Sequence, residues 1–240
     1  MRILTISDVA VDIIHSPRLA ERFGDVDLVL ACGDLDFDYL EYIVTILAKP
    51  LYYVFGNHAQ RKVLCEDGTC RAEPGGCVNI HHKIVNFHGV LIAGLEGSMR
   101  YRPGPHQYTQ AQMYSLVLSM APHLTWNRWR YGRSVDILIT HAPPSNIHDA
   151  PDLCHQGFRA YLYFMQKFRP RYLVHGHQHL YRQDAHRVTR YGATTVINTF
   201  GYQVIDIDET TLDPRRRVDR PRRWPGQGVT PRRQGGSAPG

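Results

Sequence analysis

The chain has 240 residues, a net charge of +6 and 43% hydrophobic residues, a length that suits one α/β domain with a substantial core. The apolar run after Arg2 is too short for the core of a signal peptide, and the run at 43–48 is too short to span a bilayer. We therefore expect a cytoplasmic protein with no membrane partner.

The first 60 residues alternate apolar runs with helical segments. Buried strands are predicted from apolar runs of four to eight residues, here at residues 2–7, 27–31 and 51–55. A short helix is predicted after the first strand, with Ser16 as its N-cap and Pro17 at its first position. A second helix is predicted at 36–48. This order predicts parallel strands joined by right-handed crossovers.

The middle of the chain holds two long loops separated by a predicted hairpin. The loop at 59–82 is polar and contains Cys65, Cys70 and Cys77. The hairpin pairs 83–87 with 90–93 through a tight His88-Gly89 turn. The second loop, 94–108, carries Arg100, Tyr101 and Arg102 among glycines and prolines. Loops of this length are usually functional or disordered, so Arg100 and Tyr101 are candidate substrate-binding residues, with a solvated loop as the alternative.

The second half of the chain again alternates helices and strands. Thr109 and Gln112 form the sequence signature of a capping box at the start of a helix. A strand is predicted at 135–140 and a helix at 158–168. The remaining strands, expected to build a second sheet, are predicted at 171–174, near Val188, at 194–197 and at 203–208.

Six polar residues directly follow buried strands, where ligands bind in open α/β sheets. They are Asp8, Asp34, Asn57, His141, His177 and His179. Any one of the Asp or Asn residues could be a simple turn former. Together, however, the oxygen and nitrogen ligands suit two divalent transition metals, Mn, Fe, Co, Ni or Zn. A pair of such ions bridged by a carboxylate can polarise a phosphoryl group and supply a hydroxide near neutral pH.

The chain resembles the calcineurin-like metallophosphoesterases over residues 3–208. The family motifs D-x-H, G-D, G-N-H-D/E, an isolated H and G-H-x-H correspond here to Ser7-Asp8-Val9-Ala10, Gly33-Asp34, Gly56-Asn57-His58-Ala59, Thr140-His141 and Gly176-His177-Gln178-His179. The resemblance implies an α/β fold, a two-sheet β-sandwich flanked by helices. It also implies hydrolysis of a small phosphomonoester or phosphodiester substrate by a metal-bound hydroxide.

The same resemblance assigns a role to each motif residue. It implies that Asp34 bridges the two metals and that Asp8 and His179 hold the first. It implies that Asn57, His141 and His177 hold the second. His58 would contact the phosphoryl oxygen or protonate the leaving group.

Two departures from the motifs bear on function. Ala10 replaces the histidine of the first motif, so we expect weaker occupancy of the first metal site, unless His15 or Asp12 substitutes. Ala59 replaces the acidic residue that usually follows His58. These losses keep open a non-catalytic relative that binds a metal or a phosphorylated ligand.

Other histidines and cysteines have less defined roles. His148 and His155 follow His141 closely enough to line the same cleft, which makes them candidate substrate-binding residues. Cys65, Cys70 and Cys77 could bind structural zinc together with His81 and His82, but their spacing matches no standard zinc motif. Reduced thiols are the default expectation in a cytoplasmic protein.

The positive charge is concentrated at the C-terminal end. Residues 213–240 contain eight arginines and two aspartates, which account for the whole net charge and leave a neutral body. With little to bury, this stretch predicts a disordered Arg/Pro/Gly-rich tail at 211–240 after a metallophosphoesterase domain at 1–210. A basic tail could bind nucleic acid and suggests a nuclease, but the neutral body disfavours that partner.

Overall fold

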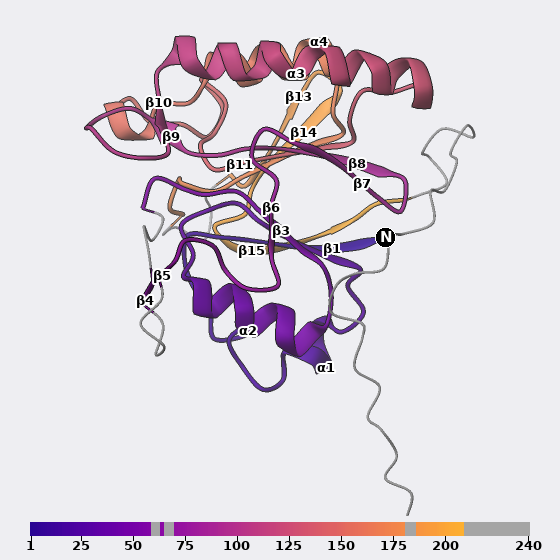
Figure 1. Ribbon diagram of the computed structural model, residues 1–240. Helices are drawn as coiled ribbons and strands as arrows, with labels where there is room; N and C mark the ends of the chain where they lie inside the picture. The colour runs from indigo at the N-terminus through magenta and orange to yellow at the C-terminus, as the bar shows by residue number, and fades with distance from the viewer. Residues whose placement is uncertain (59–62, 65–69, 181–185, 209–240) are drawn as a thin grey trace, which may run out of the picture.

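The structure is a computed structural model, and it describes residues 1–58, 63–64, 70–180 and 186–208. Figure 1 shows two β-sheets stacked face to face, with α1 and α2 covering the outer side of one sheet and α3 and α4 covering the other. This arrangement confirms the predicted α/β sandwich flanked by helices.

The first sheet has five strands. Its order is β15 (Gly201–Asp206), β1 (Arg2–Ser7), β2 (Leu28–Ala31), β3 (Leu51–Tyr53) and β6 (Val78–Asn79). The pairs between β1, β2 and β3 are parallel, as predicted, whereas β15 is antiparallel to β1. The short strand β6, which lies within the loop predicted at 59–82, is parallel to β3. The prediction that the last strand belongs to the second sheet was wrong: β15 pairs along the whole of β1, which would otherwise be an exposed edge.

The second sheet has six strands, four of them parallel in its middle. Its order is β13 (Val188–Tyr191), β14 (Thr194–Asn198), β12 (Tyr172–His175), β11 (Ile137–Thr140), β8 (Val90–Leu95) and β7 (Ile84–Phe87). The edge strands β13 and β7 are antiparallel to their neighbours. The long loops contain two further short pairs, β4 (Val63–Leu64) with β5 (Cys70–Arg71) and β9 (Ser98–Met99) with β10 (Gln107–Tyr108).

Alternation along the strands divides the buried residues into three layers. Leu28 and Leu30 of β2 face the second sheet, while Val29 and Ala31 face the helices α1 (Leu19–Phe23) and α2 (Phe37–Leu47). Side chains alternate in the same way along β11, where Leu138 faces α3 (Gln110–Tyr131) and α4 (Arg159–Phe168). Both sheets are therefore buried on both faces, which leaves their ends for function.

Helix starts were predicted with mixed success. The capping box at Thr109 and Gln112 is present at the start of α3. Ser16 does not cap α1: the helix begins at Leu19, and Ser16 instead accepts a hydrogen bond from the Arg18 backbone N–H at 3.2 Å. Ser16 therefore forms a local turn before the helix, a conformation that serine side chains also favour.

No helix in the described part of the chain is long and apolar enough to cross a membrane. The predicted tail and its boundary near residue 210 lie outside the described residues.

Candidate metal centre

The carboxyl ends of β1, β2 and β3 meet those of β11 and β12 at one end of the sandwich. The backbone there turns sharply: Asp8, Asp34 and His177 have φ angles of 66°, 54° and 66°. Such left-handed conformations are uncommon for residues other than glycine and concentrate at functional sites. Gly33, at φ 96°, also has to be glycine, since a Cβ atom there would lie 2.6 Å from Nδ1 of His141. The turns therefore bring the ligand candidates together.

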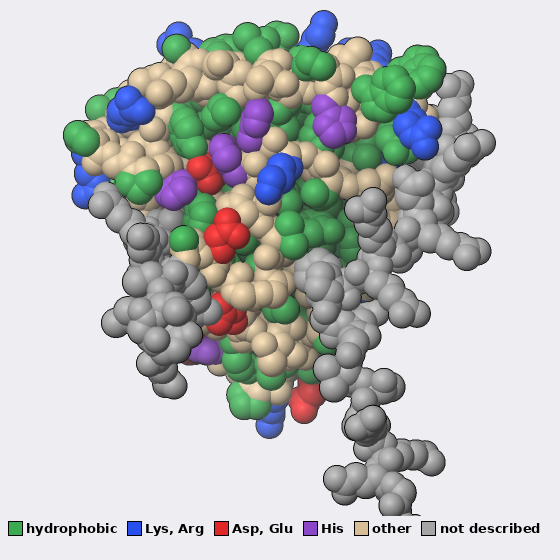
Figure 2. All heavy atoms as spheres, in the orientation of Figure 1, with side chains coloured by type: hydrophobic (Ala, Val, Ile, Leu, Met, Phe, Trp, Pro, Cys, Tyr) green, Lys and Arg blue, Asp and Glu red, His purple; other side chains and the backbone are tan. Residues whose placement is uncertain are grey.

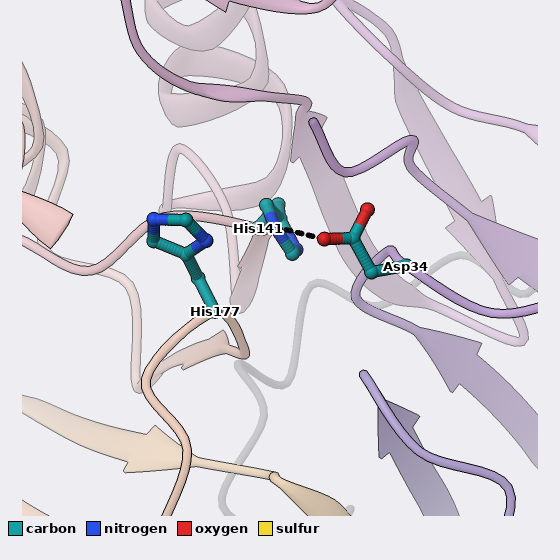
Figure 3. A group of neighbouring side chains, drawn as sticks. All are labelled: Asp34, His141 and His177. Carbon is teal, nitrogen blue, oxygen red and sulfur yellow. Dashed lines mark ion pairs between the residues drawn. The ribbon is translucent and has the colours of Figure 1, made fainter. Parts of the chain in front are cut away.

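Four of the six predicted ligands converge on one point. His141 Nε2 lies 3.0 Å from Oδ1 of Asn57 and 3.1 Å from Oδ2 of Asp34. His177 joins them, with ligand atoms of Asp34, His141 and His177 all within 4.8 Å of one another. Figure 3 shows the His177 ring turning one nitrogen toward His141 and Asp34. Two nitrogen and two oxygen donors thus surround a common space, a set that fits a divalent transition metal.

Backbone carbonyls fix which nitrogen each imidazole presents to that space. His141 Nδ1 lies 2.8 Å from the carbonyl oxygen of Cys32, and His177 Nε2 lies 2.7 Å from that of Cys154. Because a carbonyl oxygen only accepts hydrogen bonds, these two ring nitrogens carry the protons. Nε2 of His141 and Nδ1 of His177 are left to bind a cation, the arrangement that metal-ligating histidines usually have.

The charges of this group are strongly coupled. Burial raises the pKa of Asp34, but the His141 charge, its hydrogen bond and the His58 backbone N–H outweigh burial and lower that pKa to about 2. Burial lowers the pKa of His141, yet Asp34 and Asp8 raise it to about 9. The pKa of His177 falls to about 3 because of burial and the neighbouring His141 charge. Without a cation, then, the His141 proton neutralises the carboxylate.

Asp8 and His179 form a second part of the site, in which the ligand candidates lie farther apart. His179 Nε2 lies 3.9 Å from Oδ1 of Asp8, and its ring lies beside Phe200. Both oxygens of Asp8 accept from the His177 backbone N–H, at 2.9 and 3.0 Å. Burial raises the pKa of Asp8. His15, a suggested substitute for the missing ligand at Ala10, packs its ring against Tyr39 and Tyr42 of α2.

The predicted substrate-contacting residues differ in their placement. The His58 backbone N–H donates to Oδ1 of Asp34 at 2.8 Å, and His58 itself is exposed. The Tyr101 hydroxyl accepts from the Asn57 amide at 3.3 Å, so Tyr101 touches the site. Arg100 instead donates to the Gln107 carbonyl and to the Gln112 side chain, against the start of α3. Ala59 lies outside the described residues.

His148 and His155 also separate. Nδ1 of His148 lies 2.9 Å from Nε2 of His175, and Nε2 of His148 lies 2.8 Å from the Thr189 hydroxyl. These hydrogen bonds attach His148 to the second sheet. The His155 ring lies 5.1 Å from the His177 ring and so borders the metal-ligand candidates. Of the two, His155 has the better placement for a contact in the cleft.

A buried carboxylate that the sequence did not reveal supports the loop carrying Tyr101. Glu96, 6% exposed, accepts from His106 at 2.9 Å and from Tyr108 at 2.7 Å. Histidine and acidic side chains gather beneath α3 on the face drawn in Figure 2. The available signal was a charged residue directly after the apolar run of β8, at the start of the loop predicted at 94–108. Glu96 thus fixes the loop rather than the metal ligands.

The suggested zinc site in the first long loop has little support where it can be assessed. Among the described side chains, Cys77, His81 and His82 do not form a group with converging ligand atoms. Cys77 donates to the Gly75 carbonyl, His82 contacts Ser119, and His81 accepts from the Glu96 backbone N–H. The side chains of Cys65 and Cys70 lie outside the described residues.

Comparisons with known proteins agree with this architecture. A family model described as calcineurin-like phosphoesterase matches residues 1–181. One solved crystal structure aligns with a TM-score of 0.59 at 12% identity, over 85% of this chain and 94% of the other. TT1561 of Thermus thermophilus aligns with a TM-score of 0.54 at 14% identity, over 83% and 89% of the two chains. A search of curated protein sequences gave no match. At these identities the solved structures bear on the fold alone.

Proposed function

Because the chain belongs to the calcineurin-like phosphoesterase family, we propose that it is a metal-dependent hydrolase of phosphate esters, acting as a phosphatase or phosphodiesterase on a small phosphorylated substrate. The observation that carries this proposal is the position of two side-chain oxygens, Oδ1 of Asn57 and Oδ2 of Asp34, within 3.1 Å of Nε2 of His141. His177 completes the set, and its second nitrogen is held by a backbone carbonyl.

The residues fit a bound metal, and each has a definable task. Divalent ions such as Mn²⁺ held there would polarise a phosphoryl group and lower the pKa of a bound water. Asn57, His141 and His177 would hold one ion, Asp34 would bridge, and Asp8 with His179 would hold a second, weaker one. The two left-handed aspartates and the carbonyl-bound imidazoles keep the ligands oriented before any ion binds.

His58 is the residue we assign to proton transfer. It follows Asn57 directly, its residue is exposed, and its charge lowers the pKa of Asp34, which supports a position for its ring near the phosphoryl group. Histidine is a common general acid and can donate a proton to a leaving alkoxide.

Hydrolysis of p-nitrophenyl phosphate and bis(p-nitrophenyl) phosphate by Mn²⁺-loaded protein tests this proposal. His58→Asn should lower kcat by about 10²–10⁴-fold for an alkyl phosphate such as glycerol 2-phosphate, whose leaving alkoxide needs a proton, without changing metal content. His123→Asn, an exposed histidine on the outer side of α3, is the matched control and should keep full activity. Lack of hydrolysis of both substrates by the loaded wild-type protein between about pH 6 and about pH 9 would contradict the proposal.

A binding protein without turnover is the alternative that Ala10 favours. In that case the protein would bind metal and inorganic phosphate, and His58→Asn would leave both affinities unchanged while no variant hydrolysed an ester. The nuclease interpretation depends on the basic stretch at 213–240, outside the described residues, and we do not favour it. Assaying DNA cleavage with and without that stretch separates it from the main proposal.

A further inference from the structure

A second group of potential ligands lies on the segment between β11 and α4. The segment contains a 3-10 turn, η1 (Leu153–His155), preceded by Asp152. Oδ2 of Asp152 lies 2.8 Å from Sγ of Cys154 and 2.6 Å from Nδ1 of His155, and the sulfur lies 3.3 Å from that same nitrogen. One oxygen, one sulfur and one nitrogen therefore converge.

Helix capping does not explain this group. An aspartate at an N-cap normally accepts a backbone N–H of the first turn. Asp152 occupies the N-cap of η1 but makes no such bond, and the contacts of its carboxylate are with the two side chains.

A catalytic cysteine, histidine and aspartate arrangement does not explain it either. In such a relay the imidazole uses one nitrogen for the nucleophile and the other for the carboxylate. Here Nδ1 of His155 faces both the thiol and the carboxylate. Three different ligand atoms that lie close together are instead the arrangement in which side chains bind one metal ion. We call Asp152, Cys154 and His155 the tripod.

We propose that Asp152, Cys154 and His155 hold a divalent ion of the zinc class, separate from the ligands of the main centre. A tetrahedral zinc with bonds of about 2.0–2.3 Å places its ligand atoms about 3.3–3.6 Å apart. The observed separations of 2.6, 2.8 and 3.3 Å need only a small outward rotation of partly exposed side chains. The thiol loses its proton on binding, and water fills the fourth position.

The tripod is connected to the main centre through the backbone. The Cys154 carbonyl accepts from Nε2 of His177 at 2.7 Å, and the His155 carbonyl accepts from the Gln178 side chain at 3.0 Å. An ion at the tripod would hold this segment against the Gly176-His177-Gln178 turn. Its role is therefore structural: it keeps the His177 ring in the orientation that presents Nδ1.

Cobalt substitution tests the tripod independently of hydrolysis. Among the described side chains, no cysteine belongs to the main centre: Cys32, the nearest thiol in sequence to Asp34, is fully buried and donates to the Val174 carbonyl. Co²⁺ bound at the tripod should give a thiolate-to-cobalt charge-transfer absorption in the near ultraviolet, whereas Co²⁺ at the main centre should not.

Three variants decide the outcome. Cys154→Ser should abolish the absorption and lower the zinc content by one ion per chain, and Asp152→Asn should weaken zinc binding by about tenfold or more. Cys77→Ser, a half-buried thiol outside the tripod, is the matched control and should keep the absorption. Circular dichroism checks that each variant is folded. Absence of the absorption in the wild type, or its persistence in Cys154→Ser, would overturn the proposal. Failure of the hydrolysis assay alone would leave these results unaffected.

Discussion

The two halves of the candidate centre are built from similar residues but differ in how completely they are prepared. Around His141, two oxygens lie within 3.1 Å of one imidazole nitrogen, and both imidazoles are held by carbonyls. Around Asp8, the nearest imidazole is 3.9 Å away, and both carboxylate oxygens already accept a backbone N–H. The difference shows that a metal site depends on the hydrogen bonds that orient its ligands as much as on the types of its ligand residues.

Removing one histidine from each half gives the largest expected contrast. His141→Ala deletes a ligand candidate at the convergent half, so we expect phosphoesterase activity to fall by more than about 100-fold. His179→Ala, the matched change at the half that contains Asp8, should lower the activity by less than about tenfold. Both are measured as kcat/KM with bis(p-nitrophenyl) phosphate, together with metal content. Equal losses in the two variants would remove the distinction between the halves.

The pH dependence of the free energy of unfolding should show the interaction between His141 and Asp34. The pKa of His141 in the metal-free fold is about 9, against an ordinary value of 6.5. Because the folded pKa is the higher one, the stabilisation is fully present below about pH 6.5 and is lost as the pH rises through about 9. Its full value is on the order of 3 kcal/mol.

Urea unfolding of metal-free protein measures this effect near pH 6 and near pH 9.5, values that bracket the transition. His141→Gln is the control and should lack most of the decrease in the free energy of unfolding. An equal decrease in that variant would assign the pH dependence to other groups.

Restoring the missing ligand should bring the two halves closer together. Ala10→His adds an imidazole two residues after Asp8, at the position where the family motif has one. We expect affinity for the second equivalent of Mn²⁺ to increase about tenfold, or about 1.4 kcal/mol. Isothermal titration measures both equivalents, and an unchanged weaker affinity would contradict the ligand assignment of Asp8 and His179.

The smallest effect is expected from Tyr101→Phe. The Tyr101 hydroxyl accepts from Nδ2 of Asn57, which keeps Oδ1 of that amide facing His141. Losing the hydroxyl should lower the affinity of the tighter metal site by about tenfold at most. This is the lower end of the range for groups that orient a metal ligand. Arg100→Lys is a suitable control because Arg100 contacts Gln107 and Gln112 instead.

The sequence predicted the framework of the fold because local patterns decide it. The apolar runs that became β1, β2 and β11 are strands buried on both faces, and the Thr109 capping box marks the start of α3. The placement of β15 could not be read in this way, since an apolar alternating strand fits either sheet. Only the unpaired edge of β1 decides between them.

The site was predictable in its residue types but not in its supporting contacts. The strand ends identified the ligand candidates, which the structure brings to one end of the sandwich. No pattern indicated that the Cys32 and Cys154 carbonyls would orient two imidazoles, or that Glu96 would support the Tyr101 loop. Those contacts join segments far apart in the chain, and they depend on the packing of the two sheets.

A titration of metal-free protein with Mn²⁺ tests the difference between the two halves most directly. Mn²⁺ prefers oxygen and nitrogen ligands, so it should favour the main centre over the Cys154 tripod. Electron paramagnetic resonance of the unbound ion then gives the affinity of each equivalent. We expect one equivalent of Mn²⁺ to bind tightly and a second to bind at least about tenfold more weakly. His141→Ala should abolish the tight binding. Two equally tight equivalents, or a tight equivalent that survives in His141→Ala, would contradict the account.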